Sequence, residues 1–258
     1  MNKWIIGARP RTLPAAVAPV LVATALAGNS ASLLPALLAL IVRNSLQVGV
    51  NYANDYSDGI RGTDANRVGP TRITASGLAT PASVKAAAFI AFGIGAVAGL
   101  GLAVMTSWWL IAVGVASILA AWGYTGGKNP YGYLGLGELF VFIFFGVVAT
   151  VGTFYVQTEL ITLDSLLASI PMGTFACALL AINNIRDRAL DAPAGKKTLA
   201  VRLGDRKARY FFAALIVLGY VAALSIGSIW ILLTLLTARS GSRSSRRCSG
   251  PRTDSLPS

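Results

Sequence analysis

The chain has 258 residues, of which 55% are hydrophobic and only 12% are charged. A mean hydropathy of +0.65 and repeated long apolar runs exclude an ordinary soluble domain and indicate a polytopic membrane protein. The net charge of +12 would favour nucleic acid in a soluble chain, but here the basic residues lie between apolar runs, so we expect no nucleic-acid partner.

Apolar runs of about 20 residues are long enough to cross a membrane once. On that basis the sequence predicts an all-α transmembrane helical bundle with about seven full spans and a truncated eighth. The truncated span begins near Ile229, and the full spans are expected at 12–28, 33–54, 83–105, 108–124, 137–156, 165–185 and 210–227.

The connections between these spans differ in charge. Those after the first, third, fifth and seventh spans carry no Lys or Arg, whereas those after the second, fourth and sixth are basic. The positive-inside rule then places the amino terminus and the basic connections in the cytoplasm. We therefore expect a multi-pass protein of the inner or plasma membrane, surrounded by lipid, with its active site on the cytoplasmic side.

The second span ends in a cluster of amide and carboxylate side chains. Asn51, Asp55 and Asp58 follow one another at helical spacing, so we expect them to share one face. Ionisable groups at membrane depth are costly unless they face an interior cavity and find partners. The cluster is therefore a candidate functional site.

A second cluster ends the sixth span, with Asn183, Asp187 and Asp191. Asn183 precedes Asp187 by the same four residues that separate Asn51 from Asp55. Two such half-sites suit one divalent cation or cation cluster, and carboxylate and amide oxygens favour Mg²⁺ over zinc. The predicted metal ligands are Asn51, Asp55, Asp58, Asn183, Asp187 and Asp191.

Two further features lie near these clusters. Arg43 is in the middle of the second span, where we expect it to pair with an interior polar group; a contact with substrate is the alternative. The segment 121–138 is rich in Gly, which serves either as turn punctuation or to let backbone approach an anion. It matches neither the P-loop nor the dinucleotide pattern.

These motifs resemble those of the UbiA superfamily of intramembrane prenyltransferases. The resemblance rests on the stretch from Asn51 to Asp64, on Asp187 with Asp191, and on Tyr124 with Lys128. It implies a helical bundle whose cytoplasmic-side cavity opens to lipid, and Mg²⁺-dependent transfer of a polyprenyl group from polyprenyl diphosphate to an aromatic acceptor. The sequence is most similar to the branch that prenylates 1,4-dihydroxy-2-naphthoate in menaquinone biosynthesis, with 4-hydroxybenzoate as the alternative acceptor.

The resemblance also implies roles for individual residues. Asp55, Asp58, Asp187, Asp191, Tyr124 and Lys128 would be catalytic, with Tyr124 as a wall of the acceptor pocket. The residues that would neutralise the diphosphate are Arg61, Arg67, Arg72, Lys128 and Lys196.

The resemblance covers residues 1–236, which we interpret as the transmembrane prenyltransferase domain. Residues 237–258 are rich in Ser and Arg, a composition that neither forms a core nor crosses a membrane, so we expect this tail to be disordered. It is either a native basic segment or the product of a shifted reading frame, and the frame shift is favoured.

A cation-coupled transporter is the alternative from another functional class, because two similar half-sites could bind a coupling ion between repeats. The carboxylates, however, fall at the cytoplasmic ends of their spans, whereas coupling sites lie near the midplane. The sequence therefore favours the enzyme.

Overall fold

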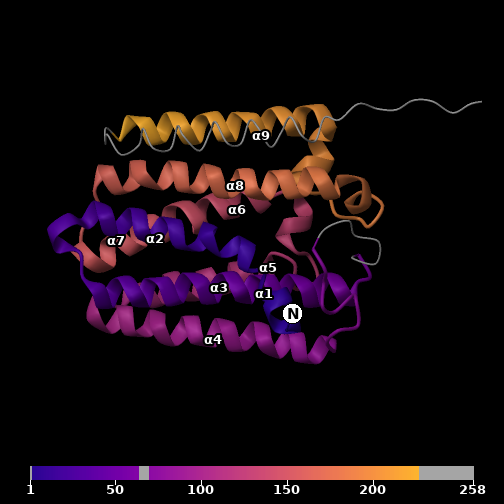
Figure 1. Ribbon diagram of the computed structural model, residues 1–258, viewed down its shortest axis with the longest axis horizontal. Helices are drawn as coiled ribbons and strands as arrows, with labels where there is room; N and C mark the ends of the chain where they lie inside the picture. The colour runs from indigo at the N-terminus through magenta and orange to yellow at the C-terminus, as the bar shows by residue number, and fades with distance from the viewer. Residues whose placement is uncertain (1, 64–69, 227–258) are drawn as a thin grey trace, which may run out of the picture.

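The structure is a computed structural model that describes residues 2–63 and 70–226. Within these ranges the chain forms helices and no strand. The long helices lie side by side, with α4 and α3 at one edge of the bundle and α8 and α9 at the other (Figure 1). The predicted all-α bundle is confirmed.

The helices follow the apolar runs closely. In chain order the elements are α1 (Lys3–Ala8), η1 (Pro10–Thr12), α2 (Leu13–Ala27), η2 (Gly28–Ser30), α3 (Leu33–Ile60), α4 (Pro81–Met105), α5 (Trp109–Gly123), η3 (Tyr131–Leu134), α6 (Gly137–Val141), η4 (Phe142–Val148), α7 (Ala149–Thr158), α8 (Leu163–Asp191) and α9 (Leu199–Ser225).

The number of full spans differs from the prediction. Among the described residues, six segments are long and apolar enough to cross a membrane: Lys3–Ser30, Leu33–Ile60, Pro81–Met105, Gly137–Thr158, Leu163–Asp191 and Leu199–Ser225. The predicted span at 108–124 forms the 15-residue α5. At 1.5 Å per residue α5 is about 22 Å long, which is shorter than a hydrocarbon core of about 30 Å. The predicted eighth span and the tail 237–258 lie outside the described residues.

The π-helical segment η4 directly connects α6 to α7 and packs against α8. Small residues allow this approach, because a Cβ added to Gly146 would lie 2.6 Å from the Cα of Gly173. π-helical turns often occur at functional sites. Here the segment carries Phe144 and Phe145, which line an interior cavity.

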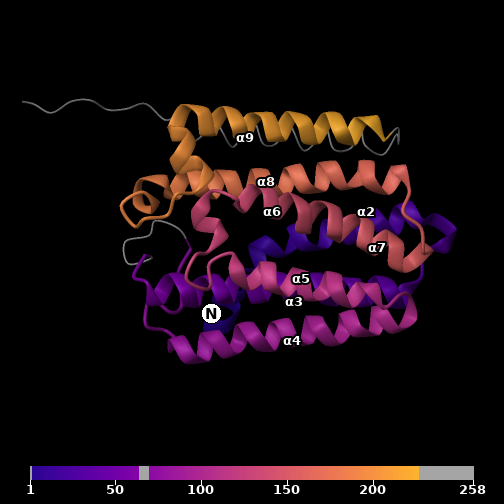
Figure 2. The ribbon, with the colours of Figure 1, turned by 180° about the vertical axis from the view of Figure 1, so that it is seen from behind.

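Both Asn/Asp clusters are helical. α3 continues to Ile60 and α8 continues to Asp191, several residues beyond the predicted ends of their spans. The carboxyl ends of α3 and α8 lie at the same end of the bundle, as both views show (Figures 1 and 2). The two clusters are therefore brought to one end of the molecule, as the topology predicted.

Candidate active site

The two Asn/Asp clusters meet at a polar cavity of about 180 Å³. Asp58 comes from α3, whereas Asp187 and Asp191 come from α8. Other lining residues include amides of α8, basic residues and tyrosines, among them Asn183, Asn184, Arg72, Lys196, Tyr124 and Tyr133. The structure thus brings together carboxylates, amides and cations that lie far apart in the sequence.

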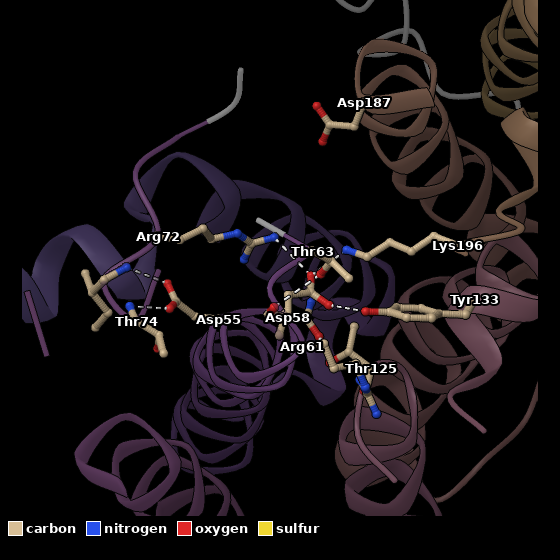
Figure 3. Close-up of polar contacts among 12 residues, drawn as sticks. Asp55, Asp58, Arg61, Thr63, Arg72, Thr74, Thr125, Tyr133, Asp187 and Lys196 are labelled. Carbon is tan, nitrogen blue, oxygen red and sulfur yellow. Dashed lines mark hydrogen bonds and ion pairs between the residues drawn. The ribbon is translucent and has the colours of Figure 1, made fainter. Parts of the chain in front are cut away.

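Asp58 is at the centre of the charged contacts in this cavity and is only 3% exposed. Lys196 Nζ lies 3.0 Å from Asp58 Oδ2, and Arg72 Nη2 lies 3.6 Å from the same oxygen. Tyr133 donates a 2.6 Å hydrogen bond from its hydroxyl to Asp58 Oδ1 (Figure 3). A buried carboxylate needs such partners, because an unpaired buried charge is costly.

The Tyr133 hydroxyl remains a hydrogen-bond donor at neutral pH. Burial raises the pKa of Tyr133 well above its ordinary value, and the nearby negative charge of Asp58 raises it further. Lys196 also lies 5.1 Å from the centre of the Tyr133 ring. Tyr133 therefore contacts both members of the Asp58–Lys196 ion pair.

Asp55 contacts a different part of the chain. Its carboxylate is fully buried and accepts hydrogen bonds from the backbone N–H groups of Ile73 (2.9 Å) and Thr74 (2.8 Å). Asp55 does not line the polar cavity. It fixes the loop that immediately follows Arg72, so in this structure it orders the segment that presents Arg72 to Asp58.

Asn51 joins α3 to the amino-terminal segment. Its Nδ2 donates to the carbonyl oxygen of Ala8 (2.8 Å) and to Thr12 Oγ1 (3.1 Å), while its Oδ1 accepts from Gln47 Nε2 (3.2 Å). Asn51 thus contacts the amino-terminal segment, whereas Asp55 and Asp58 both contact residues 72–74. Asn51 lines an apolar cavity and not the polar one.

The second cluster is arranged more simply. Arg186 donates from Nε and Nη2 to the two carboxylate oxygens of Asp187, at 2.7 and 2.8 Å. Asn183 donates to the carbonyl oxygen of Leu179 one turn earlier (2.8 Å). Asp187 lies apart from the Asp58 group in Figure 3. Over residues 2–63 and 70–226, no three acidic, His or Cys side chains are close enough to hold a metal ion together.

The predicted diphosphate-binding residues separate into two groups. Arg72 and Lys196 line the polar cavity and are buried. Arg61 does not line it, because its guanidinium donates to the backbone carbonyls of Thr125 and Gly127.

Two predicted basic residues remain. Lys128 is exposed and lines neither cavity. Arg67 lies outside the described residues.

The Gly-rich segment folds back on Tyr124. Gly132 donates its backbone N–H to the carbonyl oxygen of Tyr124 (3.0 Å), and a Cβ added to Gly132 would lie 2.6 Å from that oxygen. Glycine at this position therefore permits close packing within the loop. In this arrangement Tyr124 lines both cavities and Tyr133 lies beside Asp58.

An apolar cavity of about 190 Å³ adjoins the polar one. Its walls include the side chains of Leu46, Val50, Phe140, Phe144, Phe145 and Leu179. The two cavities share six lining residues, namely Arg9, Thr12, Asn54, Tyr124, Leu180 and Asn183. An apolar molecule in one cavity would therefore adjoin a charged group in the other.

Arg43 lies on this apolar cavity, and the expected interior polar partner is absent among the described residues. The guanidinium carbon lies 4.5 Å from the centre of the Phe145 ring. The Nε and Nη2 atoms are buried and have no hydrogen-bond partner in the described part of the chain. The prediction of a polar pair was wrong, because among the described residues the Arg43 guanidinium contacts the aromatic ring of Phe145.

Arg9, Asn54, Tyr133 and Asn184 are four of the cavity residues that were not predicted from sequence. Arg9 and Asn54 line the boundary between the two cavities. Asn184 directly follows Asn183, and Tyr133 lies in the Gly-rich segment that the sequence had marked. Proximity to the predicted motifs was the available signal for three of the four.

Known proteins resemble this chain over most of its length. The profile of the UbiA prenyltransferase family matches residues 16–249. The chain is 50% identical over 240 residues to a 1,4-dihydroxy-2-naphthoate octaprenyltransferase of Mycobacterium tuberculosis, covering 92% of this chain and 82% of that protein. A protein of the same name from Escherichia coli is 39% identical over 249 residues, covering 91% and 81%.

A solved structure shares the fold. It is the structure of a UbiA homologue from Archaeoglobus fulgidus bound to GPP and Mg²⁺, which superposes with a TM-score of 0.69 at 15% identity. The superposition covers 99% of this chain and 92% of that one.

Proposed function

Because this chain belongs to the UbiA prenyltransferase family, we propose that it transfers a polyprenyl group from a polyprenyl diphosphate to 1,4-dihydroxy-2-naphthoate in menaquinone biosynthesis. The observation that carries this proposal is the polar cavity between α3 and α8, with its carboxylates and cations, next to an apolar cavity. A polyprenyl diphosphate likewise combines a charged diphosphate group with an apolar isoprenoid tail in one molecule.

The diphosphate would bind in the polar cavity. Lys196 and Arg72 supply buried positive charge, and the Tyr133 hydroxyl supplies a neutral donor. All three groups now contact Asp58, so donor binding requires them to turn from Asp58 to the diphosphate oxygens. Charge-assisted hydrogen bonds from these groups would stabilise the negative charge that develops as diphosphate leaves.

The donor set of the cavity fits Mg²⁺. Carboxylate and amide oxygens are hard ligands, and Asp58, Asp187, Asp191 and Asn183 line the same cavity. Asp58 and Asp187 now contact Lys196 and Arg186, and each would exchange this cationic partner for the metal. Asn51 and Asp55 remain proposed ligands that would need to turn from their present partners. Bound Mg²⁺ would neutralise part of the diphosphate charge and favour its departure.

The allylic end of the donor and the ring of the acceptor would meet in the apolar cavity, with Tyr124 as part of its wall. The carbon–oxygen bond between the allylic carbon and diphosphate breaks, and a ring carbon of dihydroxynaphthoate forms the new carbon–carbon bond. Loss of the ring carboxylate as CO₂ then gives the reduced form of a demethylmenaquinone. The low polarity of this cavity would keep water away from the allylic cation.

The cavity end of the bundle is also the end that carries the basic connections. We therefore propose that the active site faces the cytoplasm, in the inner or plasma membrane. This orientation would let the soluble, charged naphthoate reach the site from the cytoplasm while the isoprenoid tail stays in lipid.

A prenyl-transfer assay in membranes tests the proposal. Membranes that contain the protein should convert dihydroxynaphthoate and a polyprenyl diphosphate to a prenylated quinone, and excess chelator should stop the reaction. 4-Hydroxybenzoate is the comparison acceptor, and it should give little product. Faster prenylation of 4-hydroxybenzoate would contradict the proposed acceptor, whereas undiminished turnover in chelator would contradict the metal requirement.

A further inference from the structure

Glu138 is a buried carboxylate that the proposed reaction does not use. It lies in the first turn of α6 and is 6% exposed. Its Oε1 accepts a 3.0 Å hydrogen bond from Nδ2 of Asn184 on α8. Its backbone carbonyl accepts a 3.0 Å hydrogen bond from Sγ of Cys177, two turns earlier on α8. Glu138 is thus held against α8 at two points.

The contact with Glu138 determines which way the Asn184 amide faces. Glu138 Oε1 accepts the hydrogen bond, so Asn184 directs its NH₂ group toward Glu138. The amide oxygen then points the other way. A flipped amide would place the lone pairs of two oxygen atoms against each other, which is unfavourable. Asn184 lines the polar cavity in which the donor would bind.

We propose that Asn184 supplies a further oxygen ligand to the divalent cation of the donor complex, and that Glu138 is the positioning residue that fixes this oxygen. The inference rests on the proposed function, because it assumes a cation in the polar cavity. It adds Asn184 to the cavity's donor set beside Asn183 and Asp187. A hard amide oxygen is suited to Mg²⁺.

The free-energy cost of burying the Glu138 carboxyl group supports a specific role for this residue in the site. A buried carboxylate is unfavourable unless hydrogen bonds satisfy it, and the Oε2 atom of Glu138 has none among the described residues. Residues that orient metal ligands through hydrogen bonds are nearly as important for metal binding as the ligands themselves. Their loss typically lowers metal affinity or activity by about 10- to 100-fold.

Binding of Mn²⁺ to the purified protein, with an unreactive polyprenyl thiolodiphosphate present, tests this inference without turnover. Glu138→Leu and Asn184→Leu should each weaken Mn²⁺ binding by about 10-fold or more. Glu138→Gln should bind Mn²⁺ nearly as well as the wild type, because its amide oxygen still accepts from Asn184. The exposed Glu159, on α7's carboxyl-terminal side, provides the matched control Glu159→Gln.

The double variant Glu138→Leu/Asn184→Leu separates positioning from packing. If Glu138 acts only through Asn184, the double variant binds Mn²⁺ no worse than Asn184→Leu alone. Unchanged Mn²⁺ affinity in Asn184→Leu would overturn the proposal, and this variant decides the question even if Glu138→Leu does not fold. Normal Mn²⁺ binding without prenylated product in the wild-type protein would instead contradict the proposed function.

Discussion

Lys196 Nζ lies 3.0 Å from Asp58 Oδ2, and this ion pair joins the end of α3 to the segment between α8 and α9. Both side chains are nearly inaccessible to solvent. Asp58, from the first Asn/Asp cluster, is therefore paired with Lys196, which follows the second cluster in the sequence. Positive charge is already in place where the diphosphate would bind, and Asp58 would become available to a metal when Lys196 turns to the donor.

Replacement of Asp58 should be more damaging than its small change in size suggests. Asp58→Asn leaves Lys196 and Arg72 buried without their shared counter-ion, and loss of one partner of a buried ion pair typically costs about 3–5 kcal/mol. We expect a lower midpoint of thermal unfolding and a loss of turnover of about 100-fold or more. The control is Asp164→Asn, an exposed residue in the first turn of α8 at the opposite end of the bundle. Equal losses in the two variants would contradict this prediction.

Asp55 should act through the loop that follows Arg72. In Asp55→Asn one oxygen becomes an NH₂ group, which cannot accept the hydrogen bond from Ile73 or Thr74. Leaving a buried donor unsatisfied costs about 1–3 kcal/mol. We expect faster amide hydrogen exchange at these two residues and a higher KM for the diphosphate donor. If exchange in the loop stays as slow as in the wild type, the structural role assigned to Asp55 is wrong.

Lys196 and Lys128 should differ in their effect on donor binding. Lys196 is buried beside Asp58, whereas Lys128 is exposed and lines neither cavity. Lys196→Met should therefore raise the KM for polyprenyl diphosphate by about 10-fold or more, since hydrogen bonds to charged groups contribute about 1.5–3 kcal/mol. Lys128→Met should leave this KM close to the wild-type value. A larger effect at Lys128 would favour the role that its motif predicted.

Arg43 should be a source of instability in the resting protein. Its Nε and Nη2 atoms are buried without hydrogen-bond partners among the described residues, and its guanidinium faces the Phe145 ring. Replacing a poorly satisfied buried charge by an apolar side chain of similar length is often neutral or stabilising. We expect Arg43→Met to raise the midpoint of thermal unfolding in detergent. A lower midpoint, or a selective rise in the KM for the acceptor, would show that Arg43 has a partner in the working enzyme.

The helices and the two half-sites could be predicted because they depend on local pattern. The apolar run and helical spacing from Leu33 onward predict α3, and the repeat of Asn51 and Asp55 in Asn183 and Asp187 marked both cluster-bearing helices. The length of α5 could not be predicted as closely, because the apolar composition of 108–124 extends beyond the 15 residues that are helical.

The partners of each polar residue could not be predicted in the same way. Asp55 pairs with backbone N–H groups of a loop that shows no periodicity, and such contacts depend on tertiary packing. Arg61 and Lys196 are both basic residues close to a cluster, yet only Lys196 reaches the cavity. The direction of a long side chain is set by its neighbours in three dimensions, and these come from distant parts of the sequence.

Equilibrium binding of a polyprenyl thiolodiphosphate to purified protein, measured with and without Mg²⁺, tests most directly whether α3 and α8 form one site. The account predicts tight binding that requires Mg²⁺, with weaker binding in both Asp58→Asn and Asp187→Asn and with effects of the two substitutions that are not additive. Donor binding that is equally tight in chelator, or that is lost on Asp58→Asn but unchanged in Asp187→Asn, would contradict it.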